Sequence, residues 1–354
     1  MIDGTMNEDW IENARMIVES ARAVVPADGN LARVRAARFQ GCGFDRAVMA
    51  QAAELGWPLM RVAEDAGGLG LGLRETCALE VLGAGLLPEP VLSTITAAAL
   101  LQEALPEEAM TGEAVIVTAW QDATGDQGWQ GGAWDGTLQG TKVNVPGAEG
   151  ADLFAVLTGA GVAIVPRDAQ GVTVESAETL DGCRPGRVRL DGLAAEILPC
   201  PRAEAVLQDA RLAHAAYLLG LSGRALEITL DYLRVREQFG RSIGSFQSLQ
   251  HRATEMKISL ELSRAAIFAT ARRFDAGADP RARAHGAARC KLRASGLAML
   301  VAREAVQMHG AMGITDEADI GLFVRKAMAE ANTYGSPREQ RATLTGLLAE
   351  EHAA

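Results

Sequence analysis

The chain has 354 residues, more than one ordinary hydrophobic core holds, so two or three units of about 100 to 150 residues are expected. Hydrophobic residues at 48% and charged residues at 22% indicate a soluble globular protein, and no stretch reaches the roughly 18 uninterrupted apolar residues of a membrane helix. The opening residues, MIDGTMNEDW, lack the basic region and apolar core of a secretory signal, so we expect a cytoplasmic location.

Charge and cysteine usage argue against several kinds of site. A net charge of −11 disfavours nucleic acid as a partner. The cysteines form no CxxC pair and the histidines show no ligand spacing, so neither a disulfide framework nor a metal site is expected. Residues 231–300 are nevertheless basic, with 13 Lys or Arg against 6 Asp or Glu. Such a segment suits a phosphate-bearing small molecule, or it is a solvated helix face that binds nothing.

Residues 1–110 predict an N-terminal helical domain. An apolar stripe with helical spacing and a glycine stop is formed by Phe44, Val48, Ala52, Leu55 and Gly56. The glycine-rich stretch GGLGLG, residues 67–72, has no strand before it and no GK[ST] after it. A tight turn between helices is therefore favoured over a phosphate cradle.

Residues 111–202 predict a middle domain that is an antiparallel β-sheet or a small barrel. Short β-branched runs occur in EAVIVTAW, GTLQGTKVNVPGA, ADLFAVLTGAGVAIVP, GVTVES and GRVRLDG. The third of these contains two runs separated by residues 158–161, Thr-Gly-Ala-Gly, which predict a hairpin.

Residues 203–354 predict a C-terminal four-helix bundle, so the whole chain is expected to be an α+β multidomain protein. Leucines recur seven residues apart at Leu212, Leu219, Leu226 and Leu233. A second stripe is formed by Phe246, Leu249, Met256, Leu260 and Ile267. Such spacing is typical of long antiparallel helices. Two further helices are predicted near residues 286–309 and 318–330.

The stretch DYLRVREQFGRSIGSFQSLQH, residues 231–251, predicts a helix that stops and restarts at once. Gly240 and Gly244 give the backbone the freedom to turn there. Several polar side chains crowd around the break. By residue type alone, Phe239 and Phe246 belong in a core and Arg236 is a helix-end charge.

The order of helices, β unit and bundle, together with four stretches of sequence, resembles the acyl-CoA dehydrogenase family of flavoproteins. The stretches are ELGWPLMRVAEDAGGLGLGL, WDGTLQGTKVNVPGAEGADLFAV, LRVREQFGRSIGSFQSLQHRATEM and AVQMHGAMGITDEADIGLFVRKA. They extend nearly from end to end of the chain, and the R-x-Q-F-G pattern in the third is the most specific.

The resemblance implies α,β-dehydrogenation of an acyl-CoA thioester with FAD as cofactor. A carboxylate removes the proton next to the thioester while the β-carbon passes a hydride to the flavin. An electron-transfer flavoprotein is the implied electron acceptor, with direct oxygen reduction as the alternative. The sequence does not specify the acyl group, because the side chains that line the cavity decide it.

The resemblance also implies the cofactor contacts. In the family the R-x-Q-F-G break lies where one subunit meets the dinucleotide of its neighbour. The implied contacts come from Arg236, Gln238, Phe239, Gln247, Gln307 and Gly310. The Arg236 guanidinium would engage two pyrophosphate oxygens at once, which a lysine cannot do. His251 and His309 flank these motifs, and packing or hydrogen bonding is the expected role of both.

The sequence departs from the family pattern at the flavin ring. Members usually carry a T-E-P-G-A-G-S-D-like stretch that holds the isoalloxazine, whereas the corresponding place here reads VTAWQDATGDQGWQG. Thr118 and Trp120 are the candidates left for a ring contact.

A second departure concerns the catalytic base. The two positions at which the family places a glutamate hold Ala210 and Tyr334. Tyrosine, with an ordinary pKa of about 10, is a poor proton acceptor at neutral pH. Asp209 is a weak candidate, since one residue along a helix turns a side chain by about 100°. A charge favoured by the helix dipole is the alternative for Asp209, so the catalytic residue is unknown.

An intact dinucleotide motif without a ring pocket or a base predicts one subunit of a heteromeric acyl-CoA dehydrogenase. The partner would supply ring pocket and base, and this chain would lend its arginine and glutamines across the interface. The stretch GITDEADIGLFVRKA most resembles the smaller, less complete chain of such pairs, which act on steroid-derived or dicarboxylic acyl-CoA. A self-sufficient homo-oligomer with a displaced base and a non-redox scaffold of the same fold are the alternatives.

Overall fold

The computed structural model describes residues 5–134 and 137–353 of the chain. These form two compact units. The helical unit comprises Met1–Leu31, Cys77–Leu87 and Leu212–Ala354, and the β unit comprises Ala32–Thr76 and Pro88–Arg211. The expected boundaries of three domains, at residues 110 and 202, stay a prediction.

Short helices make up the first part of the β unit. They are α2 (Ala32–Ala37), α3 (Arg46–Glu54), η1 (Trp57–Leu59), η2 (Glu64–Ala66), α4 (Leu73–Cys77), α6 (Val91–Leu101), η3 (Gln102–Ala104) and α7 (Glu107–Thr111). The predicted helix before Gly56 is confirmed as α3. The Asp45 side chain caps it by accepting a hydrogen bond from the Ala47 amide (2.9 Å), and Gly56 follows with φ of 75°.

The glycine-rich stretch, residues 67–72, is the predicted tight turn between helices. It joins η2 to α4, and Gly67 and Gly70 have φ of 80° and 57°. A Cβ on Gly68 would lie 2.2 Å from the Val62 carbonyl oxygen. Glycine is therefore required there by backbone conformation and by close packing.

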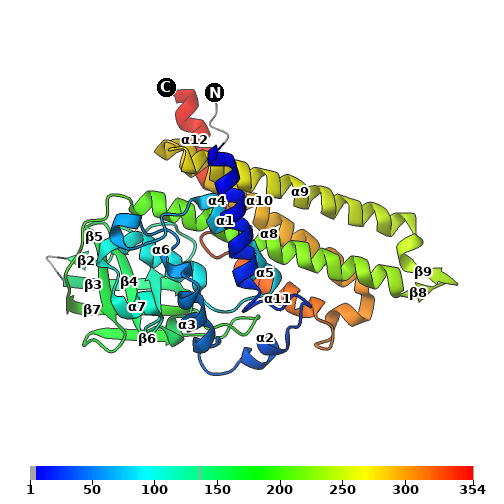
Figure 1. The fold of residues 1–354 in the computed structure, drawn as a ribbon, viewed down its shortest axis with the longest axis horizontal. Coiled ribbons are helices and arrows are strands. Elements are labelled where there is room, and N and C mark those ends of the chain that lie inside the picture. Colours follow the sequence, from blue (N-terminus) through cyan, green and yellow to red (C-terminus); the bar gives the residue numbers. More distant parts are fainter. Residues whose placement is uncertain (1–4, 135–136, 354) are drawn as a thin grey trace. The chain divides into compact units, whose positions relative to one another are not determined.

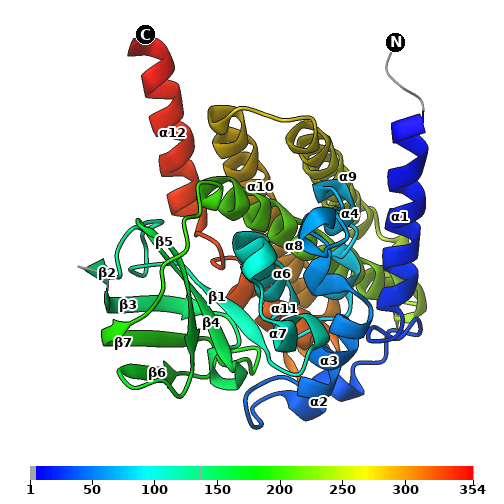
Figure 2. The ribbon, with the colours of Figure 1, turned by 60° about the vertical axis from the view of Figure 1, so that its left-hand side comes forward.

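The strands of the β unit form two sheets (Figure 2). Their bounds are β1 (Ile116–Ala119), β2 (Ala133–Trp134), β3 (Thr137–Val145), β4 (Leu153–Thr158), β5 (Gly161–Pro166), β6 (Val172–Ser176) and β7 (Gly186–Ala194), with η4 (Ala148–Gly150) before β4. The first sheet has the order β1-β4-β5 and the second the order β2-β3-β7-β6. The predicted hairpin is confirmed, because Thr158 of β4 pairs with Gly161 of β5.

The expectation of an entirely antiparallel sheet is wrong at one pair. Strand β1 runs parallel to β4. Parallel neighbours need a long crossover connection, and here the chain passes through β2 and β3 of the other sheet before it returns as β4.

Long helices dominate the helical unit (Figure 1). The long ones are α1 (Thr5–Ala21), α8 (Ala203–Val235, in this unit from Leu212 on), α9 (Gln247–Asp275), α10 (Pro280–His309) and α12 (Pro337–Ala353), and the shorter ones are α5 (Glu80–Ala84) and α11 (Ile320–Glu330). The four predicted bundle helices are confirmed as α8 to α11, and the four leucines seven residues apart are all buried. Helix α12, which packs on α10, was not predicted.

Helices α5 and α8 touch through glycine. A Cβ on Gly83 would lie 1.9 Å from the Tyr217 carbonyl oxygen, and a Cβ on Gly220 would lie 1.8 Å from the Glu80 carbonyl oxygen. The Tyr217 hydroxyl donates to the Leu87 carbonyl (3.1 Å) just beyond α5. The crossing therefore depends on two residues without side chains.

Candidate functional site

The break between α8 and α9 is a small β-hairpin. Strand β8 (Glu237–Gln238) pairs with β9 (Arg241–Ser242), and η5 (Ile243–Ser245) leads into α9. Phe239 and Gly240 form the turn with φ of 55° and 78°, the left-handed pair that a two-residue hairpin loop requires. The predicted stop and restart is thereby confirmed. Gly244 serves close packing, since a Cβ there would lie 2.8 Å from the Leu233 carbonyl oxygen.

The side chains of this hairpin point to solvent. Arg236, Gln238 and Gln247 are exposed, and Phe239 is 90% exposed. The core position that residue type alone gives Phe239 is therefore wrong. The Phe239 ring meets Phe246 edge to face (6.1 Å between centroids), and the Arg241 guanidinium lies 4.2 Å above the Phe246 ring. These contacts support the hairpin, which together with the adjoining residues 236–247 is here called the α8–α9 tip. They leave the Phe239 ring open to solvent.

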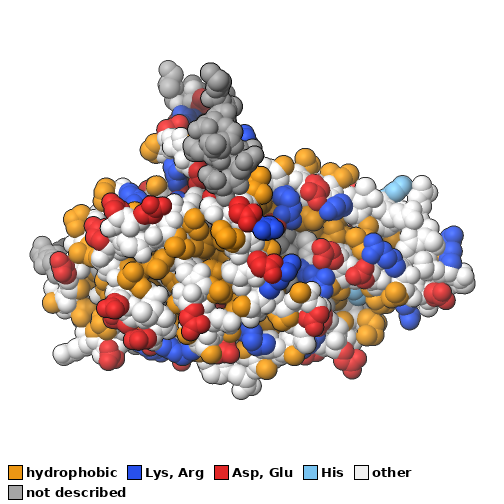
Figure 3. Space-filling view, in the orientation of Figure 1, with side chains coloured by type: hydrophobic (Ala, Val, Ile, Leu, Met, Phe, Trp, Pro, Cys, Tyr) orange, Lys and Arg blue, Asp and Glu red, His pale blue; other side chains and the backbone are white. Residues whose placement is uncertain are grey.

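A stacked pair of aromatic rings connects α8, close to this tip, with the end of α10, where Gln307 and Gly310 lie. The rings of Tyr232 on α8 and His309 on α10 lie 4.3 Å apart, and His309 Nδ1 is 2.8 Å from the Ala305 carbonyl oxygen. Tyr232 lies one turn before Arg236, and Gln307 lies two residues before His309. The two motifs are therefore at the same end of the helical unit, where Figure 3 shows basic side chains on the surface.

The end of α10 presents the remaining predicted residues. Gln307 is exposed, and Gly310 ends the helix with φ of 62° while its amide donates to the Val306 carbonyl. Burial lowers the pKa of His309, so its imidazole is neutral at pH 7. The packing and hydrogen-bonding role expected of His309 agrees with these contacts, whereas His251 is exposed. The stack with Tyr232 has no sequence signal, since 77 residues separate the two.

These residues fit the dinucleotide half of FAD. Among the described residues no hydrogen bond or ion pair engages the Arg236 guanidinium, so its donors are free for phosphate oxygens. The neighbouring glutamines supply amide donors and acceptors, and Phe239 supplies an exposed ring. The site residues Arg236, Gln238, Phe239, Gln247, Gln307 and Gly310 stay a prediction as cofactor contacts.

The loop at the place of the family's flavin-ring motif, residues 120–132 and here called the ring-side loop, is built around a buried lysine. Lys142 of β3 is completely buried. Its ammonium donates to the carbonyl oxygens of Trp120 (3.2 Å), Trp129 (3.1 Å) and Gly131 (2.9 Å) and to the Asp122 carboxylate (2.5 Å). Burial lowers the pKa of Lys142, and the hydrogen bond and charge of Asp122 act in the opposite direction.

The two candidates for a ring contact are also engaged by the protein. The Thr118 hydroxyl is fully buried and donates to the Ser93 carbonyl (2.9 Å), while the Thr118 amide donates to the Ser93 hydroxyl (2.9 Å). Trp120 is 4% exposed. The ring half of the cofactor therefore does not find free donors at these two residues.

The second base position, Tyr334, lies in a buried polar cluster of the helical unit. Its ring is 5.6 Å from His214, whose Nε2 is 2.9 Å from the Glu330 carboxylate. Lys326 pairs with the other oxygen of Glu330 (2.9 Å). Burial raises the pKa of Glu330, but the charge of Lys326 and the hydrogen bond of His214 outweigh it and hold that pKa well below its ordinary value. Such a carboxylate is a weak proton acceptor.

The first of the two expected base positions holds Ala210, which has no carboxylate, and the carboxylate of the neighbouring Asp209 is already engaged. Ala210 is buried, and the Asp209 carboxylate forms an ion pair with Arg61 (2.8 Å). Asp209 lies in the second turn of α8, and this pair engages its carboxylate. Its assignment as a weak candidate base stays a prediction. Glu330 and Arg61 were missed by sequence reasoning, because their partners are 116 and 148 residues away.

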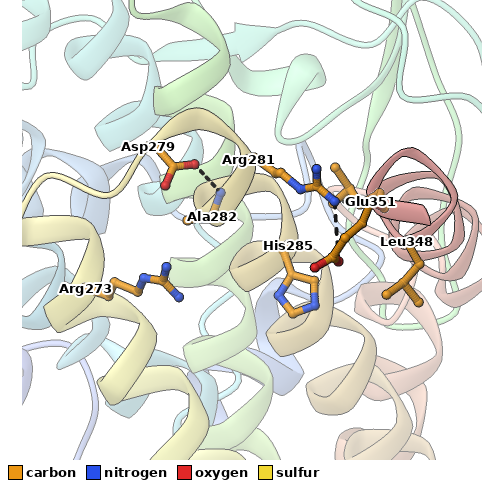
Figure 4. Close-up of a pocket in the computed structure, with 8 residues that line it drawn as sticks. Arg273, Asp279, Arg281, Ala282, His285, Leu348 and Glu351 are labelled. Atoms are coloured by element: carbon orange, nitrogen blue, oxygen red, sulfur yellow. Dashed lines mark hydrogen bonds and ion pairs between the residues drawn. The ribbon is translucent and has the colours of Figure 1, made fainter. Parts of the chain in front are cut away.

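A hollow of about 290 Å³ lies at the opposite end of α9 and α10, against α12 (Figure 4). Three of its charged groups are engaged by the protein: Asp279 accepts from the Ala282 amide (2.9 Å), and Arg281 donates to the Leu347 carbonyl (2.5 Å) and pairs with Glu351 (3.6 Å). Only Arg273 and His285 of its basic lining lack such a contact within the described residues. The hollow therefore carries no catalytic arrangement.

Membrane crossing and metal binding find no support in the described structure. Within residues 5–134 and 137–353, no helix combines the length and apolarity needed to cross a bilayer. In the same part of the chain, no cluster of His, Cys, Asp and Glu side chains is arranged to hold a metal ion.

Comparison with known proteins identifies the family. Residues 11–109 match the model of the acyl-CoA dehydrogenase N-terminal domain, and residues 200–345 match that of the acyl-CoA dehydrogenase C-terminal domain. The acyl-CoA dehydrogenase IpdE2 of Mycobacterium tuberculosis is 30% identical over 332 residues, which cover 93% of this chain and 95% of the relative.

Solved structures agree with this assignment. The Tcur3481-Tcur3483 steroid ACAD G363A variant is 27% identical with a TM-score of 0.86, covering 98% of this chain and 99% of that one. The ChsE4-ChsE5 complex of Mycobacterium tuberculosis is 26% identical with a TM-score of 0.83, covering 96% and 97%. With its helical, β and helical parts in this order, the chain belongs to the acyl-CoA dehydrogenase family, whose oxidoreductases are FAD flavoproteins.

Proposed function

We propose that this chain is one subunit of a heteromeric acyl-CoA dehydrogenase. It lends the α8–α9 tip and the end of α10 to the dinucleotide half of an FAD. A related partner subunit supplies the flavin-ring pocket and the catalytic base. An electron-transfer flavoprotein takes up the electrons.

The observation that carries the proposal is an imbalance within one chain. The groups suited to phosphate and adenine are exposed and unengaged, whereas those suited to the ring and the proton are buried and engaged. Arg236 is free at the tip, while Lys142 fills the ring-side loop and Glu330 is held by two partners. The similarity to Tcur3481-Tcur3483 and to the ChsE4-ChsE5 complex, whose names each combine two different chains, supports the same interpretation.

Each residue of the tip has a physical task in this proposal. Arg236 presents parallel N–H donors to two pyrophosphate oxygens and offsets their charge. Gln247 and Gln307 hydrogen-bond the polar edge of the dinucleotide, and Phe239 packs on its flat face. The Tyr232–His309 stack keeps the two motifs together. When FAD is bound, it supplies hydride acceptance from the β-carbon of the acyl group.

The proposed substrate is an acyl-CoA with a bulky, steroid-derived acyl group. The support for it is the similarity to Tcur3481-Tcur3483, which is named a steroid ACAD. A panel of acyl-CoA thioesters of increasing bulk, assayed with the assembled enzyme and an artificial electron acceptor, tests it. Faster turnover of short, straight acyl groups than of steroid-derived ones would contradict it.

FAD stoichiometry tests the subunit role. The chain purified alone is expected to be colourless, and the chain co-produced with a related acyl-CoA dehydrogenase subunit is expected to contain FAD. A chain that is yellow by itself and bleached by an acyl-CoA would instead be the self-sufficient enzyme. A chain that stays colourless in every combination would be the non-redox scaffold.

A substitution at Arg236 tests the contact directly. Arg236→Ala in the co-produced complex should weaken FAD binding by about 1.5 to 3 kcal/mol, because a charge-assisted hydrogen bond is lost. Arg236→Lys should restore only part of it, since a lysine lacks the two-pronged donor. Arg234→Ala is the matched control, because Arg234 is also exposed but pairs with Asp231 (2.6 Å). If the Arg236→Ala complex contained as much FAD as the unaltered complex, Arg236 would not be a cofactor contact.

A further inference from the structure

Exposed basic side chains line the groove between the end of α9 and the first half of α10. The set, here called the basic groove, consists of Arg273 on α9 and of His285, Arg289 and Arg293 on α10. Its three members on α10 are four residues apart, so they follow one side of that helix at intervals of about 6 Å. Arg289 donates to the Thr270 hydroxyl of α9 (3.4 Å). Arg293 donates to the Ser263 hydroxyl of the same helix (3.2 Å), so both guanidinium groups reach across the groove.

No carboxylate in the adjoining sequence balances these charges. Residues 262–274 contain three Lys or Arg and residues 280–303 contain six, and neither stretch contains Asp or Glu. Like charges four residues apart on a helix repel each other and destabilise it. Exposed arginines elsewhere do have a carboxylate partner, as Arg22 has in Glu19. None of the four basic-groove residues forms an ion pair within residues 5–134 and 137–353. The groove therefore suits a ligand that brings the missing negative charge.

At one end the basic groove meets the hollow of about 290 Å³ between α9, α10 and α12 (Figure 4). Arg273 and His285 line this hollow, so they connect it to the groove. Its other walls carry the carboxylates of Asp279 and Glu351 and the apolar side chain of Leu348. A phosphate beside two carboxylates is repelled, whereas N–H and O–H groups can donate to them. The hollow therefore suits a neutral head with hydrogen-bond donors and apolar faces, and the groove suits an anionic tail.

A nucleoside polyphosphate has both of these parts. Its base has flat apolar faces, and its amino and sugar hydroxyl groups are hydrogen-bond donors. Its phosphates match the guanidinium groups, which bind two oxygens at once. Small-molecule pockets usually measure about 300 to 1,000 Å³, so a hollow near the lower limit takes the nucleoside and leaves the phosphates outside, along the groove.

We infer that the hollow and the basic groove together bind a nucleoside polyphosphate, with the nucleoside in the hollow and the phosphates at Arg289 and Arg293. The inference goes beyond the proposed function and does not depend on it. The site is separate from the α8–α9 tip, because Arg293 precedes Gln307 by 14 residues, or about 21 Å along α10. Free nucleotides and coenzyme A both contain an adenosine diphosphate unit, and ligand comparison distinguishes these two sources.

Charge removal tests the phosphate contacts. Calorimetric titration of the full chain with ADP gives the dissociation constant. Arg289→Ala and Arg293→Ala should each raise it about tenfold, because a guanidinium–phosphate contact is lost. Without ligand, both variants should unfold at the same temperature as the unaltered chain or above it, since the repulsion between like charges is relieved. Arg303→Ala, on an exposed part of α10 outside the groove, is the control and should leave the constant unchanged. If both groove variants kept the original constant, or if only Arg236→Ala weakened ADP binding, the inference would be wrong.

Parts of the ligand test the head. ATP should bind more tightly than inorganic tripolyphosphate, and ADP more tightly than adenosine. Leu348→Ala removes an apolar wall of the hollow and should weaken ATP about threefold while leaving tripolyphosphate unchanged; its fold should persist because Leu348 is 51% exposed. Coenzyme A tighter than ATP would identify the coenzyme as the source, the reverse order would identify free nucleotides, and both orders support the inference. Tripolyphosphate as tight as ATP would refute the nucleoside head.

Discussion

Replacing Lys142 with methionine removes the ammonium from the centre of the ring-side loop and keeps a side chain of similar volume. Four acceptors lose their donor: three backbone carbonyls and the Asp122 carboxylate. The protein interior offers those carbonyls no replacement, since the site is completely buried and a methionine side chain ends before the position of the ammonium and has no donor. We expect the Lys142→Met variant to unfold more easily and its loop to open first.

The magnitude follows from two opposing effects. Hydrogen bonds to a charged group contribute about 1.5 to 3 kcal/mol each, and the four acceptors share three N–H donors, so the gross stabilisation is about 4.5 to 9 kcal/mol. Desolvation of the ammonium costs several kcal/mol and offsets much of it. Removing one partner of a buried pair costs about 3 to 5 kcal/mol in total. Because Asp122 is 28% exposed and water can replace part of its contact, we expect a loss of about 3 kcal/mol.

Urea unfolding followed by tryptophan fluorescence measures this loss, since Trp120 and Trp129 lie in the loop itself. Limited chymotrypsin digestion reports on the loop alone and should cut the variant faster at these two residues. Lys257→Met is the matched control, because Lys257 is 58% exposed and water screens its pair with Glu261. If Lys142→Met cost less than about 1 kcal/mol, the ammonium would not hold the loop, and the account of the ring half would fail.

Two further predictions concern the helical unit. Gly83→Ala should destabilise the fold by about 3 kcal/mol, because its Cβ would lie 1.9 Å from the Tyr217 carbonyl oxygen. Gly296→Ala on α10 is the control and should stabilise the fold by about 1 kcal/mol, because the space there is open. Equal thermal midpoints of the two variants would contradict the packing of α5 on α8. Burial lowers the pKa of His309, so the folded chain keeps this imidazole neutral where the unfolded chain already takes up a proton. Stability is therefore fully present above the ordinary pKa of about 6.5 and declines as the pH falls below it. His309→Phe, which keeps a ring against Tyr232, should flatten this decline in urea titrations from pH 7 to 5, and an unchanged slope would argue against the assignment.

Local patterns predicted the elements of this fold well. Leucines seven residues apart specify one buried helix face, so the position of α8 was predicted. Gly240, which has a positive φ, indicated the break before α9. Helix α12 was missed because PREQRATLTGLLAEEHA has charged residues through much of its length and no long apolar stripe. The parallel pairing of β1 with β4 was also missed, because strand direction depends on the path between the two strands and not on either run.

The candidate site was predictable only in part, for the same physical reason. Motif residues such as Arg236 and Gln307 have recognisable neighbours in the sequence. The contacts around them are long-range in the sequence. Tyr232 with His309 links the two cofactor motifs, whereas His214 with Glu330 and Arg61 with Asp209 engage the carboxylates near the two expected base positions. Nor does a sequence pattern distinguish an exposed phenylalanine from a core one, as Phe239 demonstrates.

The exposed apolar side chains at and near the α8–α9 tip make the newly synthesised chain prone to aggregation and degradation. Val235 and Ile314 are each 77% exposed and Phe239 is 90% exposed, all in the same unit. A chain synthesised in excess of whatever covers this tip presents three large apolar side chains to chaperones, proteases and other copies of itself. If the proposed partner subunit covers this tip, production of the two chains in step protects it, and a chain made in excess is expected to be degraded or to precipitate first.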